Sequence, residues 1–135
     1  MRKLGILVLS TLLAGCSVGA DVPLAANAAA GFHRQLDAGK FADSYAAGAP
    51  ELRGVTTQQE WVQLLDAVHR KLGKFQSATQ TGWNDQMNTG GHFIVLTYQA
   101  KYERGAAAEE FVYKIDGGKA LLAGYHVNSN AFLVN

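Results

Sequence analysis

The chain has 135 residues, with 12 Lys and Arg against 11 Asp and Glu, a formal net charge of +1, and one cysteine, Cys16. A nearly neutral chain lacks the basic surface that binds nucleic-acid phosphates or anionic lipid headgroups, so the composition argues against both partners. A single cysteine excludes an intramolecular disulfide and a cysteine-based metal site.

The first 16 residues have the layout of a secretory leader that ends in a cysteine. Arg2 and Lys3 precede an apolar run over 4–13, which is about half the roughly 20 residues needed to span a bilayer. Leu13-Ala14-Gly15-Cys16 resembles a bacterial lipobox, in which Cys16 is acylated and residues 1–15 are removed as a signal peptide. Without Arg2 and Lys3 the formal charge becomes −1.

The lipobox implies a lipoprotein that is anchored by acyl chains such as palmitate. By resemblance to the enterobacterial sorting rule, Ser17 after the cysteine favours the periplasmic side of the outer membrane, with the inner membrane as the other possibility. We expect residues 16–22 to form a tether and residues 23–135 to form one domain.

Three helices are predicted next. Pro23 suits a first helical turn, and the spacing of Ala25, Ala29, Phe32 and Leu36 predicts a helix that ends near Gly39. A short helix follows over residues 40–47, ended by Gly48 and Pro50. The third begins at the capping box of Thr57 and Glu60 and ends at Gly73. Its predicted apolar stripe consists of Trp61, Leu64, Leu65, Val68 and Leu72.

After Gly73 the hydrophobic period changes from that of a helix to that of a strand. Strands are predicted over 74–84 and 92–104, around Phe111, Tyr113 and Ile115, and over 121–127. Asp116-Gly117-Gly118 is a strong hairpin signal. In the last strand, alternation places Leu121, Ala123, Tyr125 and Val127 on one side.

Helices followed by hairpin-connected strands predict an α+β fold, with the N-terminal helices packed on one face of a curved antiparallel sheet of about four strands. The other face of such a sheet stays partly open. His126, on the opposite side from Tyr125, is expected on that open face.

Several motifs together resemble the uncharacterised domain-of-unknown-function family 4019. They are 36-LDAGKFADSY-45, Val55 with Trp61, 69-HRKLG-73, 109-EEF-111, 116-DGG-118 and 123-AGY-125. The resemblance covers residues 28–128 and implies a fold similar to the cystatin-like, nuclear-transport-factor-two-like cone. Family members carry a tryptophan after the Asp-Gly turn, whereas this chain has Lys119-Ala120, so part of the core must be filled differently. The family supplies no catalytic residues.

No motif predicts catalysis, a cofactor or a metal. The four histidines do not share the spacing of a zinc site, and no Gly-x-Ser-x-Gly motif occurs. An isomerase-type pocket would need a carboxylate and a tyrosine in an apolar cavity. Both residue types are present, but Asp37 and Asp43 lie at predicted helix boundaries and Asp66 on a polar helix side.

Trp83 has polar neighbours in the sequence, which leaves two alternatives for its side chain. It is either half-buried against the sheet or exposed as an anchor in a protein interface. The candidate partner-binding residues are Trp83, Asn84, Asp85 and His126.

We therefore expect a protein without enzymatic activity that binds a protein partner. The specific hypothesis is an immunity or inhibitor lipoprotein against a periplasm-acting toxin or envelope hydrolase. The alternatives are a small-ligand-binding or enzymatic pocket protein and a structural component of the envelope.

Overall fold

A computed structural model describes residues 18–134, so the predicted signal peptide, Cys16 and Ser17 lie outside the described residues. The described part is an α+β fold with the helices before the sheet. The helices are α1 (Val22–Asp37), α2 (Phe41–Ala46), α3 (Pro50–Val55) and α4 (Gln58–Leu72). The strands β1 (Phe75–Asn88), β2 (Gly91–Tyr102), β3 (Gly105–Asp116) and β4 (Lys119–Asn128) follow, and a 3-10 turn, η1 (Asn130–Phe132), ends the fold.

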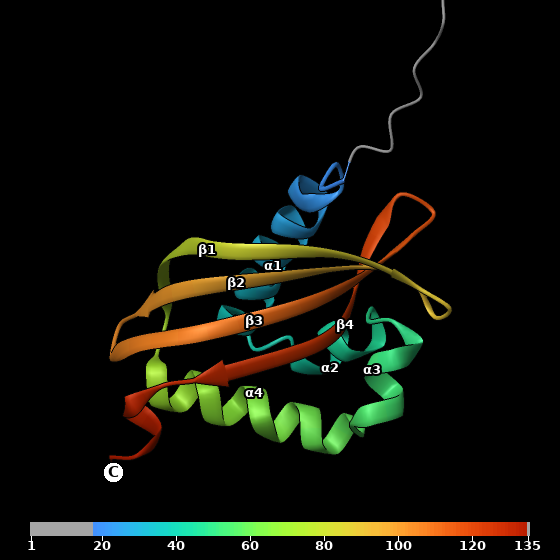
Figure 1. The fold of residues 1–135 in the computed structure, drawn as a ribbon. Helices are drawn as coiled ribbons and strands as arrows, with labels where there is room; N and C mark the ends of the chain where they lie inside the picture. The colour runs from blue at the N-terminus through green and yellow to red at the C-terminus, as the bar shows by residue number, and fades with distance from the viewer. Residues whose placement is uncertain (1–17, 135) are drawn as a thin grey trace, which may run out of the picture.

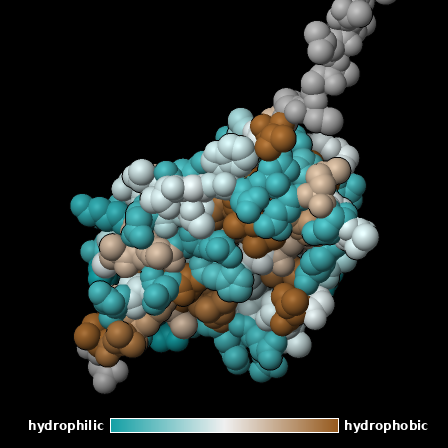
Figure 2. All heavy atoms as spheres, in the orientation of Figure 1, coloured by the Kyte–Doolittle hydropathy of each residue, from teal (hydrophilic) through white to brown (hydrophobic). Residues whose placement is uncertain are grey.

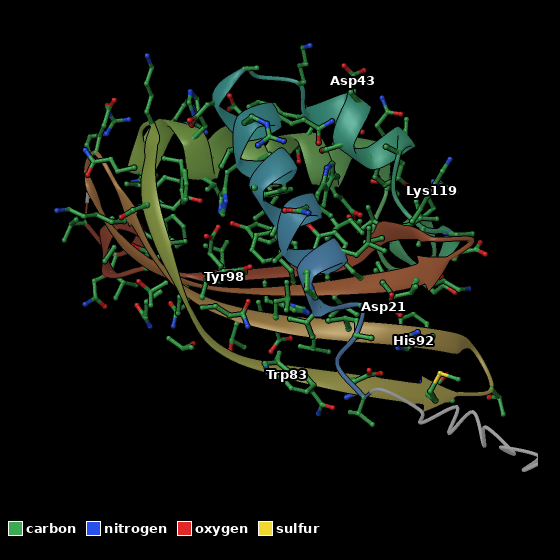
Figure 3. All side chains as sticks on the ribbon, turned by 90° about the horizontal axis from the view of Figure 1, so that it is seen from above. Asp21, Asp43, Trp83, His92, Tyr98 and Lys119 are labelled. Carbon is green, nitrogen blue, oxygen red and sulfur yellow. The ribbon has the colours of Figure 1, made fainter. Side chains whose placement is uncertain are left out.

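The sheet is antiparallel and has the order β1-β2-β3-β4, so consecutive strands are neighbours and β1 and β4 are its edges. It curves strongly, and the helices cover only its concave face (Figures 1 and 3). The α+β architecture predicted from the sequence is therefore confirmed. One hydrophobic core lies between the helices and the concave face, with Phe32, Trp61, Leu96 and Phe111 near its centre.

Helix α4 begins as predicted. The Thr57 hydroxyl accepts a hydrogen bond from Glu60 N, and the Glu60 carboxylate accepts one from Thr57 N at 2.9 Å. The hydrogen bond from Thr57 N to the carboxylate lowers the pKa of Glu60. Gly73 ends the helix at φ +75°, a conformation that favours glycine.

Helix α3 was missed by the sequence analysis, which took Pro50 only as a helix terminator. Pro50 instead occupies the first turn of α3, where its missing N–H costs no hydrogen bond. The helix is held by Arg53, which donates to Gly48 O, and by Ala49 N, which donates to Leu122 O of β4. Helix α3 therefore covers the start of the β4 edge.

Two predicted core positions were wrong. Leu64 is 39% exposed, because it lies on the flank of α4 beyond the cover of the sheet. In β4 a bulge opposite Val112 and Tyr113 shifts the alternation, so Leu122 pairs with Tyr113 and is buried, while Leu121 pairs with Lys114 on the other face.

The strand boundaries also differ in detail. Strand β1 continues to Asn88 instead of ending at residue 84, and β3, predicted only around Phe111, Tyr113 and Ile115, begins at Gly105. The hairpin predicted at Asp116-Gly117-Gly118 is present, with Gly117 and Gly118 at positive φ.

Leu64 and Leu65 make a matched pair for testing the core. Leu65 is 1% exposed, so Leu65→Ala is expected to lower the free energy of unfolding by about 2–5 kcal/mol through cavity formation. Leu64→Ala removes the same atoms from a partly exposed position and should change the free energy of unfolding by less than about 1 kcal/mol. Urea unfolding followed by circular dichroism measures both, and equal losses would contradict the packing described.

Candidate functional site

The interior of the fold holds a buried polar cluster. Glu109 of β3 is 2% exposed, and its carboxylate accepts hydrogen bonds from Tyr102 (2.8 Å) and Tyr125 (2.5 Å). Its other oxygen lies 2.9 Å from Nε2 of His33, which is also buried and belongs to α1. The His33 ring stacks on Phe75 at 3.8 Å between centroids. The cluster therefore joins α1 to all four strands.

The surroundings of Glu109 keep both tyrosines protonated. Burial raises the pKa of Tyr125 far above its usual range, and the Glu109 carboxylate raises it further. Burial and Glu109 raise the pKa of Tyr102 in the same way. The two phenols therefore stay hydrogen-bond donors to Glu109 at any physiological pH, and buried side chains of the hydrophobic core surround them.

A small cavity of about 90 Å³ lies between Phe32 of α1 and Tyr113 of β3. It borders Ala120 and Leu122 of β4, next to the turn where the sequence lacks the tryptophan expected from the family. The buried Tyr113 hydroxyl also lines it and has no hydrogen-bond partner among residues 18–134. A cavity of this volume is far smaller than the 300–1,000 Å³ typical of ligand sites.

A second feature joins the N-terminal turn to the sheet. Gly19 N donates to Asp85 Oδ2 at 2.8 Å, and Asp85 Oδ1 lies 2.7 Å from Nε2 of His92. On its other side, His92 Nδ1 lies 3.6 Å from Asp21 Oδ2. We call these residues, together with Trp83, the N-terminal clamp. Figure 3 shows Asp21, Trp83 and His92 at the same end of the molecule.

Gly19 and Trp83 are in close contact within the clamp. Gly19 adopts φ +81°, and a Cβ atom there would lie 2.7 Å from Cη2 of Trp83. Residues 19–21, which the sequence analysis assigned to a tether, are thus packed against β1 and β2.

The third feature is an apolar groove of about 480 Å³ at the β4 edge. We call it the β4 groove and define it by Val55, Leu64, Phe93, Val112 and His126. Helices α3 and α4 form one wall, while β4 and the convex face of the sheet form the other. Figure 2 shows hydrophobic side chains close together over the middle of this convex face.

One polar wall of the groove is fixed by an ion pair. The Glu51 carboxylate lies 2.6 Å from Lys114 Nζ, and this hydrogen bond lowers the pKa of Glu51. Lys114 also lies over the Phe93 ring, 5.8 Å from its centroid. The Glu51–Lys114 ion pair thus holds the Phe93 ring and the start of α3 in place, and the two opposite charges lie next to each other at the wall of the groove.

The four residues predicted to bind a partner lie in different places. Trp83, which is 48% exposed, and Asp85 both belong to the clamp. Both lie on β1, a strand with two register shifts. Asn84 is exposed and pairs with Val95 on the opposite face of the sheet. His126 is exposed on β4 and lines the groove, three strands and about 14 Å from β1.

The sequence analysis missed two of these features. Glu109 appeared only within the 109-EEF-111 family motif, and the signal that could have found it is strand alternation, by which one of two adjacent glutamates must face the core. Val55 and Leu64 were assigned to a family motif and to the core, and the groove they line depends on α3, which was not predicted.

The family model described as "Protein of unknown function (DUF4019)" matches residues 28–125. This chain belongs to the DUF4019 family. The match spans α1 to Tyr125 of β4 and so includes the Glu109 cluster and most of the groove, whereas the Gly19 and Asp21 part of the clamp precedes it. No curated protein matches the chain.

Two further observations concern the described residues of this DUF4019 protein. None of their helices is both long and apolar enough to cross a bilayer. Within residues 18–134, no group of three or more His, Cys, Asp or Glu side chains is placed to hold a metal ion.

Removing the Glu109 carboxylate should strongly destabilise the fold. Glu109→Leu leaves His33, Tyr102 and Tyr125 buried without their acceptor, so we expect a loss of about 3–5 kcal/mol in the free energy of unfolding. Glu110→Leu, the neighbouring substitution on the other face, should change it by less than about 1 kcal/mol. Urea unfolding measures both; a stable Glu109→Leu variant would show that the cluster is dispensable.

The clamp should respond to acid. The hydrogen bond from Gly19 N and, secondarily, His92 lower the pKa of Asp85. A carboxyl group with a lowered folded pKa stabilises the folded state above its unfolded pKa, and this stabilisation is lost as the pH falls through the folded value.

We therefore expect the clamp to stay closed at neutral pH and to open below about pH 4. The ¹⁵N and ¹H shifts of the Gly19 amide should titrate with Asp85, and Asp85→Asn should abolish this titration. If the Gly19 amide shifts did not change with pH in the unsubstituted protein, the hydrogen bond from Gly19 N to Asp85 would be contradicted.

Proposed function

We propose that this protein is an exported, lipid-anchored binding protein of the bacterial envelope that acts by holding a protein partner in its β4 groove. The specific form we favour is an immunity or inhibitor lipoprotein against a periplasm-acting toxin or hydrolase. The lipobox at residues 13–16 and Ser17 support anchoring through Cys16 on the periplasmic side of the outer membrane.

The observation that carries the proposal is the exposure of apolar side chains at the groove. Val55 is 78% exposed and Leu64 39% exposed, on two adjacent helices that face the same groove. With Val112 and Phe93 on the opposite wall, they make a contiguous apolar surface, and such surfaces mark interaction sites.

The edge strand favours a polypeptide as the occupant. Strand β4 ends the sheet, and α3 covers only its start, through the bond from Ala49 N to Leu122 O. From Ala123 to His126 the strand borders the groove. An extended segment of a partner can lie along such an edge and place alternate apolar side chains in the groove.

The position of the groove also favours a partner outside the membrane. The chain enters the fold at the β1 edge, while the groove lies at the β4 edge, on the far side of the sheet (Figure 1). The filled interior gives further support, because inhibition needs a rigid surface and a location but no catalytic group.

A small-ligand protein is the second candidate, and the groove volume favours it. About 480 Å³ falls within the range of ligand sites, and His126, Thr56 and Glu51 offer polar atoms at the walls. In this second candidate function, a small apolar molecule occupies the β4 groove instead of a segment of a protein partner. One capture experiment can therefore distinguish the two candidates.

The acylated chain, immobilised as bait in periplasmic and secreted extracts, should retain one stoichiometric enzyme or toxin and inhibit its activity. Val55→Asp combined with Leu64→Asp places charge in the groove and should weaken retention at least about tenfold, equivalent to about 1.4 kcal/mol.

The control is Thr79→Asp, at an exposed residue of the opposite edge strand, which should retain the partner fully. Equal retention by both variants would reject the groove as the site. A co-purifying small molecule without a protein, lost in the groove variant, would establish the second candidate instead.

A further inference from the structure

An apolar surface surrounds the point where the chain enters the fold. Val18 is 74% exposed, Trp83 48% and Met87 79%. Trp83 pairs with Leu96 and Met87 with His92, which lie on the same face of β2, so both side chains project from one face of β1. That face carries the N-terminal turn, and Figure 3 shows Trp83 close to the chain leading into α1.

The clamp fixes this surface relative to Cys16. Gly19 is held by Asp85 and lies under the Trp83 ring. Three peptide units join Cys16 to Gly19, so their Cα atoms are at most about 11 Å apart. Acyl chains on Cys16 would therefore enter a bilayer close to Trp83, whose ring contacts Gly19.

The chemistry of the surface suits uncharged lipid. Its exposed members are aliphatic, thioether and indole groups, and indole rings prefer the interface between headgroups and acyl chains. The nearby carboxylates of Asp21 and Asp85 are turned toward His92 and Gly19, and no Lys or Arg belongs to the clamp. Zwitterionic phospholipid therefore fits better than anionic lipid.

We propose that Val18, Trp83 and Met87 form a membrane-contacting surface that seats the β1 edge of the domain on a zwitterionic phospholipid bilayer. The inference rests on the lipid anchoring of Cys16 that forms part of the proposed function. It adds an orientation: the acyl chains attach the domain, and this surface, held by the clamp, stops it from turning freely about its anchor.

The two tryptophans provide the test. Trp61 is 2% exposed in the core, whereas Trp83 lies on the proposed surface. The acylated full-length protein is reconstituted in phosphatidylcholine vesicles with brominated acyl chains, which quench only nearby indoles. We expect loss of the Trp83 share of the emission relative to unbrominated vesicles. Trp83→Phe should keep the Trp61 emission and lose the response to bromine.

A matched control moves the indole to the other end of the molecule. Leu133, 85% exposed, directly follows η1, and Figure 1 shows the C-terminal end of the chain at the opposite end of the molecule from the start of α1. Leu133→Trp in the Trp83→Phe background should therefore not be quenched. Quenching there equal to that of Trp83 would overturn the orientation.

The outcomes separate this inference from its premise. Mass spectrometry and flotation first establish that the protein is acylated and vesicle-bound. Acylated, vesicle-bound protein whose Trp83 is not quenched overturns this inference alone. Protein that carries no acyl chain overturns the anchoring in the proposed function and this inference with it. Neither result depends on the β4 groove.

Discussion

The buried carboxylate of Glu109 is the interaction on which the arrangement of this protein depends. An ionised group taken out of water is costly unless it is paired and fully hydrogen-bonded. Here Tyr102, Tyr125 and His33 satisfy it from β2, β4 and α1. Because each partner comes from a different element, the cluster is satisfied only when helix and strands are in register. It therefore selects one packing of α1 on the sheet.

The same cluster determines where function can reside. Cone-shaped α+β folds can enclose a pocket between helices and sheet, but here Glu109, two tyrosines and the aromatic rings around Phe32 and Phe111 fill that space. Among the described residues, a cavity of about 90 Å³ remains beside Phe32 and Tyr113, whereas the β4 groove, about 480 Å³, opens at the sheet edge and is bordered by Trp61 and Tyr125. This packing is consistent with the function that we propose, recognition of a partner at the edge of the sheet.

Local signals in the sequence predicted local structure well. The capping box of Thr57 and Glu60 and the Asp116-Gly117-Gly118 turn act through neighbouring residues, so both are readable without the fold. The errors concern positions decided by distant contacts. Leu64 satisfies the helical period yet lies beyond the cover of the sheet, and a bulge in β4 exchanges Leu121 for Leu122. The β4 groove depends on the exposed position of Leu64 and on the unpredicted α3, so periodicity could not reveal it.

The two edge strands of the sheet, β1 and β4, are protected to different degrees, and this difference bears on the anchoring and the binding that we propose. An exposed edge strand invites unwanted pairing. The N-terminal clamp lies beside β1, which fixes the chain within a few residues of Cys16. Strand β4 is covered only at its start and remains beside an apolar groove. Three inter-strand spacings, about 14 Å, separate the edges. In the orientation that we propose, with β1 seated on the bilayer, that width and the thickness of α4 would carry the groove beyond the headgroups, where a soluble partner could reach it.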